Sequence, residues 1–412
     1  MSSEWESYQL VDLAKFKYGK FLAKTDLQNS GFPVFSGYGV VGYLPTYQFS
    51  NPQLLIVCRG EGGTGDVKMS PPNCSITNLS IVISPNDEII SQKFLYWALK
   101  ASDTHRLRTG SAQAQIVIGM LEKLKLNVPT IRKEQDYISG ILDSLDDRIA
   151  LLRKTNTTLE AIAQALFKSW FVDFDPVRAK QEGREPEGMD ADTAALFPDS
   201  FEESELGLIP KGWRVGILAH LAKLNPESWT AKTHPETVRY IDLANAKNNE
   251  IDAIIEYTFD DAPSRARRAL RAGDSIIGTV RPGNRSFAYI YQAPSNLTGS
   301  TGFAVLRSIN AQNSEFLFIA ATQDSSIDHL AHVADGGAYP AVRPEVVANI
   351  RSILPTVDVM NAFHNVVAPL FERVGENREQ AQTIATLRDT LLPRLISGQL
   401  RLPDAEALVG VV

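Results

Sequence analysis

The chain has 412 residues, of which 44% are hydrophobic and 22% are charged, a balance that excludes a mostly disordered or collagen-like protein. Its length predicts two to three domains, which can bury a core without disulfide or metal staples. The formal charge of -7 argues by itself against nucleic acid as a ligand, because proteins that bind nucleic acid usually carry a basic surface.

The start of the chain predicts neither a targeting signal nor a membrane anchor. Residues 1–8 are polar and include Glu4 and Glu6, unlike a signal peptide. No apolar run reaches 18 residues, so no membrane helix is expected. Cys58 and Cys74 form no Cys-x-x-Cys motif, which excludes a cysteine zinc ribbon and favours a reducing compartment. We therefore expect a cytoplasmic protein with no membrane contact.

Residues 1–130 form the first predicted globular segment. They are rich in glycine and proline and contain short apolar runs at Leu54–Val57 and Ile81–Ile83, which predict strands. A helix is expected at Lys93–Ala101. The motif Gly-x-Gly-x-x-Gly at Gly60–Gly65 is not expected to bind a dinucleotide, because two prolines follow it where a long helix would be required.

Basic residues in this segment are candidate DNA contacts, since lysine and arginine bind phosphates and arginine also reads guanine. For any one of them, a solvated surface charge is the competing explanation. Four lysines alternate with aromatic residues in a stretch without acidic residues, and the arginines and the glutamine flank glycine-rich loops. The candidates are Lys15, Lys17, Lys20, Lys24, Arg59, Arg106, Arg108 and Gln113.

Residues 131–175 predict a long helix that follows the first segment. Apolar side chains recur at spacings of three and four residues for nearly five heptads, which is typical of a coiled-coil seam. Asn156 is a polar exception that could fix the register of the pairing. The seam comprises Ile138, Leu142, Leu145, Ile149, Leu152, Asn156, Leu159, Ala163, Leu166 and Trp170.

Residues 176–206 separate this helix from the second globular segment. Between residues 182 and 205 the chain has nine acidic residues and one basic residue, a net charge of -8. Removing that stretch from the total of -7 leaves +1 for the rest of the chain. We interpret the segment as an acidic, solvated linker, so the chain's acidity does not describe the globular segments.

Residues 207–356 predict a second globular segment with strands at Ser275–Ile277 and Phe303–Leu306 and a helix at Ser314–Thr322. It contains its own basic cluster and an arginine pair around a Pro-Gly turn. The candidate DNA contacts are Arg265, Arg267, Arg268, Arg271, Arg281, Arg285 and Tyr339.

The two segments are predicted to be one unit repeated. At an offset of 226 residues, Gly110 matches Gly336 and Pro129 matches Pro355, and apolar positions coincide between residues 108–131 and 334–357. Residues 357–402 then predict a second long helix, with a poorer seam that contains Asn377 and Arg388. Two matched helices favour a mutual antiparallel coiled coil.

No motif in the chain predicts catalysis, a cofactor or a metal. There is no Gly-x-Ser-x-Gly, no phosphate-binding Gly-Lys-Ser/Thr and no Asn/Asp-Pro-Pro-aromatic tetrad of amino-methyltransferases. His329 and His332 lack the glutamate of a zinc-binding His-Glu-x-x-His motif. We therefore expect no catalytic residue, no cofactor and no metal site.

Four stretches resemble one family, the DNA-specificity subunits of Type I restriction–modification systems. LEAIAQALFKSWFVDFDPV at Leu159–Val177 closely resembles the central conserved region of that family. TLLPRLISGQLRL at Thr390–Leu402 resembles its distal conserved region. FPVFSGYGVVGYL at Phe32–Leu44 and LLIVCRGEGGTGDV at Leu54–Val67 look like parts of its target-recognition domains, so the resemblance covers essentially the whole chain.

The resemblance implies a mixed α/β fold with an internal pseudo-twofold repeat. Two target-recognition domains would be separated by two long antiparallel coiled-coil helices, and each domain would read half of a bipartite site in double-stranded DNA. The subunit would be non-catalytic and would bind two adenine-methyltransferase subunits and the restriction/translocase subunits. Two readers on a rigid spacer select half-sites about one helical turn, roughly 34–36 Å, apart.

We expect the helices to supply the spacer and part of the surface that docks partner subunits. For the aromatic residues, packing against the neighbouring globular segment is the competing explanation. The spacer and docking candidates are Leu145, Leu152, Asn156, Leu159, Leu166, Phe167, Trp170, Phe171, Ile384, Leu391 and Leu395.

Two other functions stay open on the sequence alone. A stand-alone DNA methyltransferase or nuclease with a divergent active site would act on DNA as an isolated chain. A coiled-coil scaffold that binds only protein would show no salt-dependent DNA binding, which phosphate contacts impose.

Overall fold

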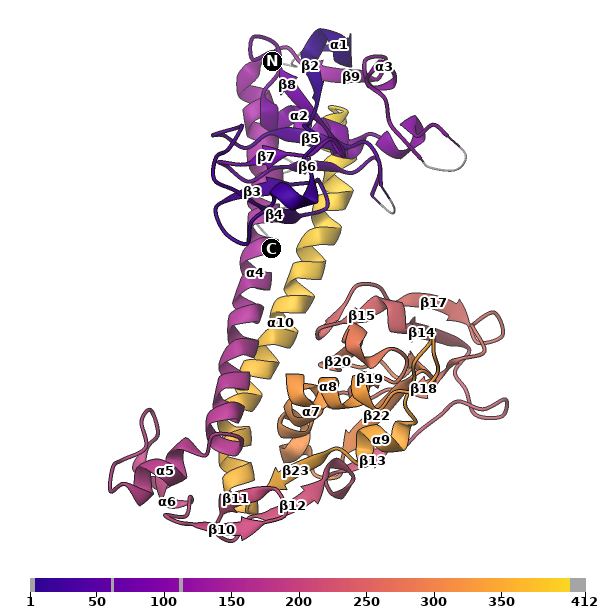
Figure 1. The fold of residues 1–412 in the computed structure, drawn as a ribbon. Helices are drawn as coiled ribbons and strands as arrows, with labels where there is room; N and C mark the ends of the chain where they lie inside the picture. The colour runs from indigo at the N-terminus through magenta and orange to yellow at the C-terminus, as the bar shows by residue number, and fades with distance from the viewer. Residues whose placement is uncertain (1–3, 61–62, 111–113, 401–412) are drawn as a thin grey trace. The chain divides into compact units, whose positions relative to one another are not determined.

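The computed structural model describes residues 4–60, 63–110 and 114–400 and divides into two compact units. Unit 1 comprises residues 1–151 and 380–412, and unit 2 comprises residues 152–379. Each unit contains a globular reader and one half of each of two long helices, α4 and α10 (Figure 1). We call residues 4–130 the first reader and residues 207–356 the second reader.

The first reader is built on a four-stranded antiparallel sheet in the order β2-β8-β5-β6. A smaller sheet has the order β4-β3-β7, with β3 and β7 parallel, and β1 pairs with β9. Helix α2 packs on β6 and β8. The elements are β1 Trp5–Gln9, α1 Leu10–Leu13, β2 Ala14–Tyr18, β3 Phe32–Phe35, β4 Val40–Leu44, β5 Leu54–Val57, β6 Val67–Met69, β7 Ser75–Ile76, β8 Ser80–Pro85, α2 Gln92–Ala101, the 3₁₀ helix η2 Thr104–Leu107, α3 Ile118–Leu121 and β9 Lys125–Pro129.

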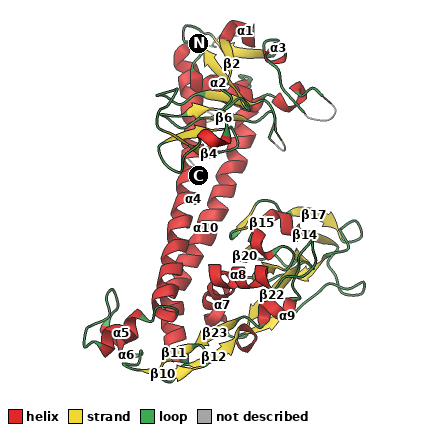
Figure 2. Cartoon of the chain, viewed as in Figure 1, coloured by secondary structure: helices red, strands yellow, loops and turns green. Residues whose placement is uncertain are grey.

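The second reader repeats this plan, with its main sheet in the order β13-β22-β19-β20 and a second sheet in the order β17-β14-β21-β18 (Figure 2). Its elements are β12 Arg214–Ile217, β13 Ala222–Leu224, β14 Thr237–Ile241, β15 Ala246–Lys247, β16 Glu250–Ile251, β17 Ile255–Thr258, β18 Ala266–Ala269, β19 Ser275–Gly278, the 3₁₀ helix η5 Pro282–Asn284, β20 Phe287–Tyr289, β21 Leu297–Ser300, β22 Phe303–Ser308, α7 Ser314–Thr322, α8 Asp324–His332, α9 Pro344–Ala348 and β23 Arg351–Leu354.

The internal repeat is therefore confirmed by the strand order of the two readers and by the offset between equivalent contacts. The apolar runs predicted as strands are β5, β8, β19 and β22, which lie at the centre of the two main sheets. An isolated bridge joins Thr109 to Gln115 in the first reader, and another joins Asp335 to Ala341 in the second, at the predicted offset of 226 residues. Gly110 and Gly336 both have positive φ within these loops, a conformation that favours glycine.

The glycine-rich loop after β5 does not open a helix. Strand β5 pairs with β6, the next strand along the chain, and the described residues between them provide no helix that could receive a pyrophosphate. Gly65 has φ +105, and a Cβ atom there would lie 2.6 Å from Nδ1 of His105. The glycine thus allows the loop to pack closely against η2.

The two long helices are α4, Arg132–Phe171, and α10, Val357–Ile396. Each has 40 residues and is about 60 Å long at 1.5 Å per residue, and α4 extends beyond both ends of its predicted seam, Ile138 and Trp170. Most seam positions are buried in both helices, whereas Leu159 and Leu166 are half-buried. The periodicity therefore identified the packed face correctly.

The polar seam positions are paired with one another across the helices. In unit 2, Nδ2 of Asn377 donates to Oδ1 of Asn156 at 2.8 Å, and Nδ2 of Asn156 lies 3.4 Å from the carbonyl oxygen of Val374. In unit 1, Arg388 forms an ion pair with Asp146. Because each buried polar group meets a partner at one register only, these pairs favour the antiparallel register over a shifted one.

The acidic segment is folded, which corrects the interpretation of a solvated linker. It contains α5 Asp175–Gln181, α6 Ala191–Ala195 and the hairpin of β10 Phe201–Ser204 with β11 Gly207–Pro210. Val177 and Phe197 are buried in the core of unit 2. Composition misled here because the acidic side chains lie between apolar residues that anchor the segment.

The aromatic residues at the end of α4 also belong to that core. Phe167, Trp170 and Phe171 are buried together with Phe316 and Phe363, and ring centroids lie 4.9–6.4 Å apart. These residues therefore pack against the neighbouring globular segment, as the alternative to partner docking predicted. A surface for partner subunits therefore needs other, exposed residues.

Candidate nucleic-acid interface

The first reader presents four unpaired lysines. Lys15 and Lys17 lie two residues apart on β2, the edge strand of the main sheet, so their side chains share one face. Lys20 and Lys24 follow on the next loop, and all four are exposed. None of them forms an ion pair with another residue that the structure describes, so their charge is available to an external anion.

Arg59 joins this lysine group to the glycine-rich loops. It follows β5 and its backbone is bridged to Gln115, while its guanidinium lies 5.9 Å from the ring centroid of Tyr18. Its Nε is buried without a hydrogen-bond partner in the described chain. The structure thus brings together residues that are about 40–55 positions apart in the sequence.

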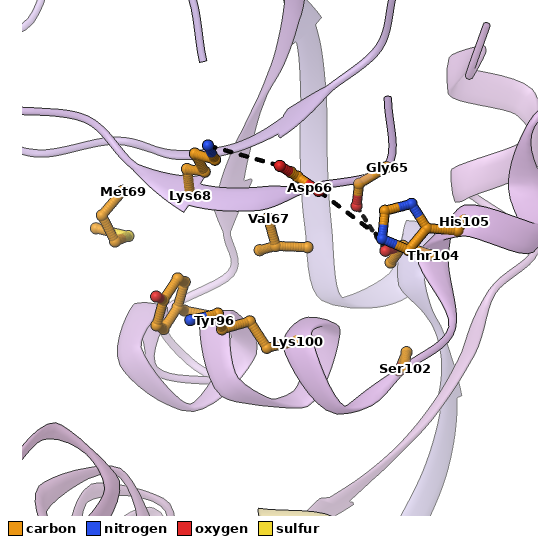
Figure 3. Close-up of a pocket in the computed structure, with 10 residues that line it drawn as sticks. All are labelled: Gly65, Asp66, Val67, Lys68, Met69, Tyr96, Lys100, Ser102, Thr104 and His105. Carbon is orange, nitrogen blue, oxygen red and sulfur yellow. Dashed lines mark hydrogen bonds and ion pairs between the residues drawn. The ribbon is translucent and has the colours of Figure 1, made fainter. Parts of the chain in front are cut away.

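Arg106 and Arg108 follow His105, which lines a pocket of about 520 Å³ (Figure 3). Nε of Arg108 donates to the carbonyl oxygen of Thr64 at 2.6 Å, and Arg106 pairs with Asp103 at 2.6 Å. Oγ1 of Thr104 donates to the carbonyl oxygen of Gly65, which ties η2 to the glycine-rich loop. Both arginines are exposed but already engaged, and Gln113 lies outside the described residues.

Arg281 and Tyr339 meet in the second reader although 57 positions separate them. The guanidinium of Arg281 lies 4.6 Å from the ring centroid of Tyr339 and donates to the carbonyl oxygen of Ala338 at 2.8 Å. Tyr339 is 70% exposed, and Arg281 has a left-handed backbone with φ 46°. Such strain in a loop is typical of functional sites.

Arg285 lies on the same turn but is bound within the protein. Its Nε donates to Oδ1 of Asn248 at 2.9 Å, and its NH1 lies 2.8 Å from Asp324. The guanidinium also lies over the ring of Phe287. These contacts give Arg285 a role in holding the turn that carries Arg281.

The cluster SRARRALR is largely neutralised by the second reader itself. Arg265 pairs with Asp242 at 2.5 Å and Arg271 pairs with Glu227 at 2.9 Å. Arg267 lies over the ring of Phe259, and burial lowers the pKa of the half-buried Arg268. The structure therefore favours structural roles for these four arginines, which sequence alone could not distinguish from DNA contacts.

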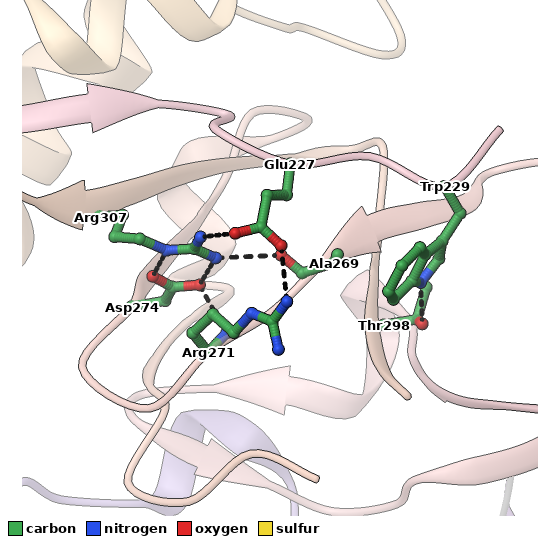
Figure 4. A network of polar contacts seen from close by, with 7 residues as sticks. All are labelled: Glu227, Trp229, Ala269, Arg271, Asp274, Thr298 and Arg307. Atoms are coloured by element: carbon green, nitrogen blue, oxygen red, sulfur yellow. Dashed lines mark hydrogen bonds and ion pairs between the residues drawn. The ribbon is translucent and has the colours of Figure 1, made fainter. Parts of the chain in front are cut away.

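Arg307 lies at the centre of the polar network that binds Arg271 (Figure 4). Its guanidinium donates to both carboxylate oxygens of the buried Asp274, at 2.7 and 2.9 Å, and also pairs with Glu227. The hydrogen bond from Arg271 is the main reason that the pKa of Glu227 is lowered. The network joins β22, the start of β19 and the loop that begins at Glu227.

Sequence reasoning missed the residues that fasten each reader to its helices. In unit 1, Nε1 of Trp97 donates to Oδ1 of Asp143 at 2.8 Å, and Lys93 pairs with the same carboxylate. These residues are 46 and 50 positions apart, and no local pattern marks such a pair.

In unit 2, the hairpin β15–β16 provides the equivalent attachment. Glu160 of α4 accepts hydrogen bonds from Asn249 at 2.9 Å and from Arg378 of α10 at 3.0 Å. Arg378 also pairs with Glu250 and lies over the ring of Tyr291. Burial is the main reason that the pKa values of Glu160 and Tyr291 are raised.

The described residues contain no group of three histidine, cysteine or acidic side chains that could hold a metal ion. His329 and His332 lie on α8 without such a group. Among the helices of the described chain, none is both long and apolar enough to cross a membrane.

Comparison with known proteins assigns the first reader. Residues 2–161 match the family model of the Type I restriction modification DNA specificity domain. This part of the chain is similar to a Type I specificity domain. The matched residues include the candidate lysines, the glycine-rich loop and α4 as far as residue 161.

Similar proteins extend this likeness over most of the chain. The HindI specificity subunit of Haemophilus influenzae is 27% identical over 385 residues, covering 80% of this chain and 82% of its own. The MjaIX specificity subunit of Methanocaldococcus jannaschii is 25% identical and covers 86% of this chain and 79% of its own. The crystal structure of a Type I specificity subunit from M. genitalium shares the fold, with a TM-score of 0.60, 16% identity and 95% and 96% coverage.

Proposed function

We propose that this chain is the sequence-specificity subunit of a Type I restriction–modification complex, in which it reads a bipartite site in double-stranded DNA. The observation that best supports this proposal is the match of residues 2–161 to a Type I specificity domain. The strand order of this domain is repeated in the second reader, and each reader is attached to the same two helices. Relatives that cover most of the chain are named specificity subunits, which supports recognition rather than catalysis.

Methyltransferase and restriction subunits are the partners that this proposal requires, and the cytoplasm is the compartment. The free lysines of the first reader and the Arg281–Tyr339 pair of the second supply the DNA-facing groups. Many other arginines are paired within the protein. We therefore infer that the isolated subunit binds DNA weakly and that partner subunits supply further contacts with the DNA. A stand-alone enzyme is the alternative, and modification or cleavage of DNA by the isolated chain would favour it.

The direct experiment is to sequence methylated adenines in cells that express the complete complex. A bipartite motif with a fixed spacer is expected only when this subunit is present. Methylation that persists without the subunit, or a single undivided motif, would overturn the proposal.

Replacing Arg281 by alanine or lysine is expected to relax one base position of the half-site read by the second reader. A good bidentate contact contributes about 1–3 kcal/mol of discrimination, and lysine cannot reproduce its forked geometry. The methylome should show tolerance at that position and an unchanged other half-site. Arg214→Ala, an exposed arginine on β12, is the control. An unaltered motif in both Arg281 variants would remove this residue from the interface.

Inserting one heptad into α4 after Leu151, with a matching heptad in α10 after Glu379, is expected to lengthen the DNA spacer. Seven helical residues add about 10.5 Å, which corresponds to about 3 base pairs at 3.4 Å each. The half-site sequences should not change. An insertion in α4 alone should abolish methylation, because the Asn156–Asn377 and Asp146–Arg388 pairs could then no longer form in one register. A matched insertion that leaves the spacer unchanged would contradict a helical ruler.

A further inference from the structure

The first reader contains a second cavity, of about 690 Å³, which borders the group of unpaired lysines at Lys24. It lies between the segment 21–29, the strands β3 and β4, and the turn 77–79. Leu27, Val34 and Leu79 give it apolar walls. Its volume is within the range of sites that bind small ring systems, about 300–1,000 Å³.

Three carboxamides line this cavity without partners. The side chains of Gln28, Asn29 and Asn78 make no hydrogen bond to another residue that the structure describes. The backbones of two of these residues are fixed, since Gln28 pairs with Tyr43 and the amide of Asn78 donates to the carbonyl oxygen of Lys20. A carboxamide carries a donor and an acceptor side by side, which matches the hydrogen-bonding edge of a nucleobase.

Phe21 lies at the wall of the same cavity and is 78% exposed. Lys20 and Lys24 flank it in the sequence, and Lys24 also lines the cavity. An exposed aromatic side chain between unpaired cations fits a polyanion with stacked rings. Apolar side chains of this kind enter between base steps, and a stacked base contributes about 1–3 kcal/mol.

The smaller sheets of the two readers differ. In the second reader a fourth strand, β18, pairs with β21, whereas the first reader's sheet ends at β7. Trp229 packs on this sheet of the second reader, and its Nε1 donates to Oγ1 of Thr298 on β21 at 2.8 Å (Figure 4).

We propose that this cavity receives one base displaced from the DNA half-site bound by the first reader, while Phe21 fills the gap left in the stack. The inference rests on the proposed function. Unstacking a base costs a few kcal/mol. Two interactions offset this cost: the neighbouring bases of the duplex stack on Phe21, and the displaced base forms hydrogen bonds with the carboxamides. The occupied base would differ from the adenine that the complex methylates.

The test uses the complex with its methyltransferase subunits and duplexes that carry 2-aminopurine at each position of that half-site in turn. The fluorescence of 2-aminopurine rises when it leaves the base stack. We expect a rise at one position other than the methylated adenine, and none with Phe21→Ala. That variant should also weaken DNA binding about tenfold, as loss of one stacked base would.

Asn78→Leu should keep the rise but lose the base preference at that position. Tyr47→Ala, an exposed aromatic residue that does not line the cavity, should behave as the parent. Bound DNA with no fluorescence rise, or a rise that survives Phe21→Ala, would overturn the inference alone. Free adenosine monophosphate that binds the complex without DNA, and loses affinity in Phe21→Ala, would also overturn it. A complex that binds no DNA would overturn the proposed function itself.

Discussion

Replacing Trp170 by alanine is expected to lower the free energy of unfolding of the isolated subunit by about 3–5 kcal/mol. Trp170 is 5% exposed, and its ring centroid lies 5.1 Å from that of Phe197 and 5.7 Å from that of Phe363. The substitution leaves a cavity among rings that anchor α4, α10 and the acidic segment together. Denaturant unfolding followed by tryptophan fluorescence and circular dichroism measures the change.

Val172→Ala is the matched control, because Val172 is two residues away and 45% exposed. It should change stability by no more than about 0.5 kcal/mol. Trp170→Phe should recover part of the loss. If Trp170→Ala unfolds like the parent but no longer co-purifies with methyltransferase subunits, the residue is a docking group and its assignment to the core is wrong.

Replacing Asp274 by alanine is expected to destabilise the second reader by about 3–5 kcal/mol, the cost of removing one partner from a buried ion pair. Asp274 is fully buried, binds Arg307 through both oxygens and accepts a hydrogen bond from the backbone of Arg271. Without it, the partners left to the guanidinium of Arg307 among the described residues are Glu227 and the carbonyl oxygen of Ala269. Hydrogen exchange of β19 and β22 should increase together with the loss of stability.

The control is Glu376→Gln, which removes an ion pair with Arg373 whose two side chains are both exposed. Such pairs contribute about 0.2–1 kcal/mol. Asp274→Asn keeps the shape and should fall between the two variants. A loss below about 1 kcal/mol in Asp274→Ala would mean that water replaces the carboxylate and that the network is not a stability element.

Local patterns predicted the elements of this fold well. The runs at residues 54–57 and 303–306 are fully apolar and became central strands, because only a buried strand accommodates such a run between turns. The seam of α4 predicted its buried face because side chains three and four positions apart share one side of a helix. The acidic segment was misjudged, since its charge conceals the anchors Val177 and Phe197.

The site was less predictable because its members come from distant positions. The sequence predicted Arg281 and Tyr339 separately as DNA contacts. Their stacking on each other depends on two loops that only the folded chain brings together. The sequence also predicted Arg265 and Arg271 as DNA contacts, because they are basic. It could not indicate that Asp242 and Glu227 pair with them in the folded protein. Composition counts charges, whereas an interface depends on which charges remain unpaired after folding.

The division of the two long helices has a consequence for inheritance. Unit 2 is one uninterrupted stretch, residues 152–379, and unit 1 is the remainder, so each hydrophobic core is encoded by its own part of the gene. Recombination at codons 151/152 and 379/380 would exchange a complete reader together with its own halves of both helices. Crossovers at the ends of the readers would instead separate Glu160 and Arg378 from Asn249. New specificities should therefore arise most readily from exchanges in the middle of α4 and α10.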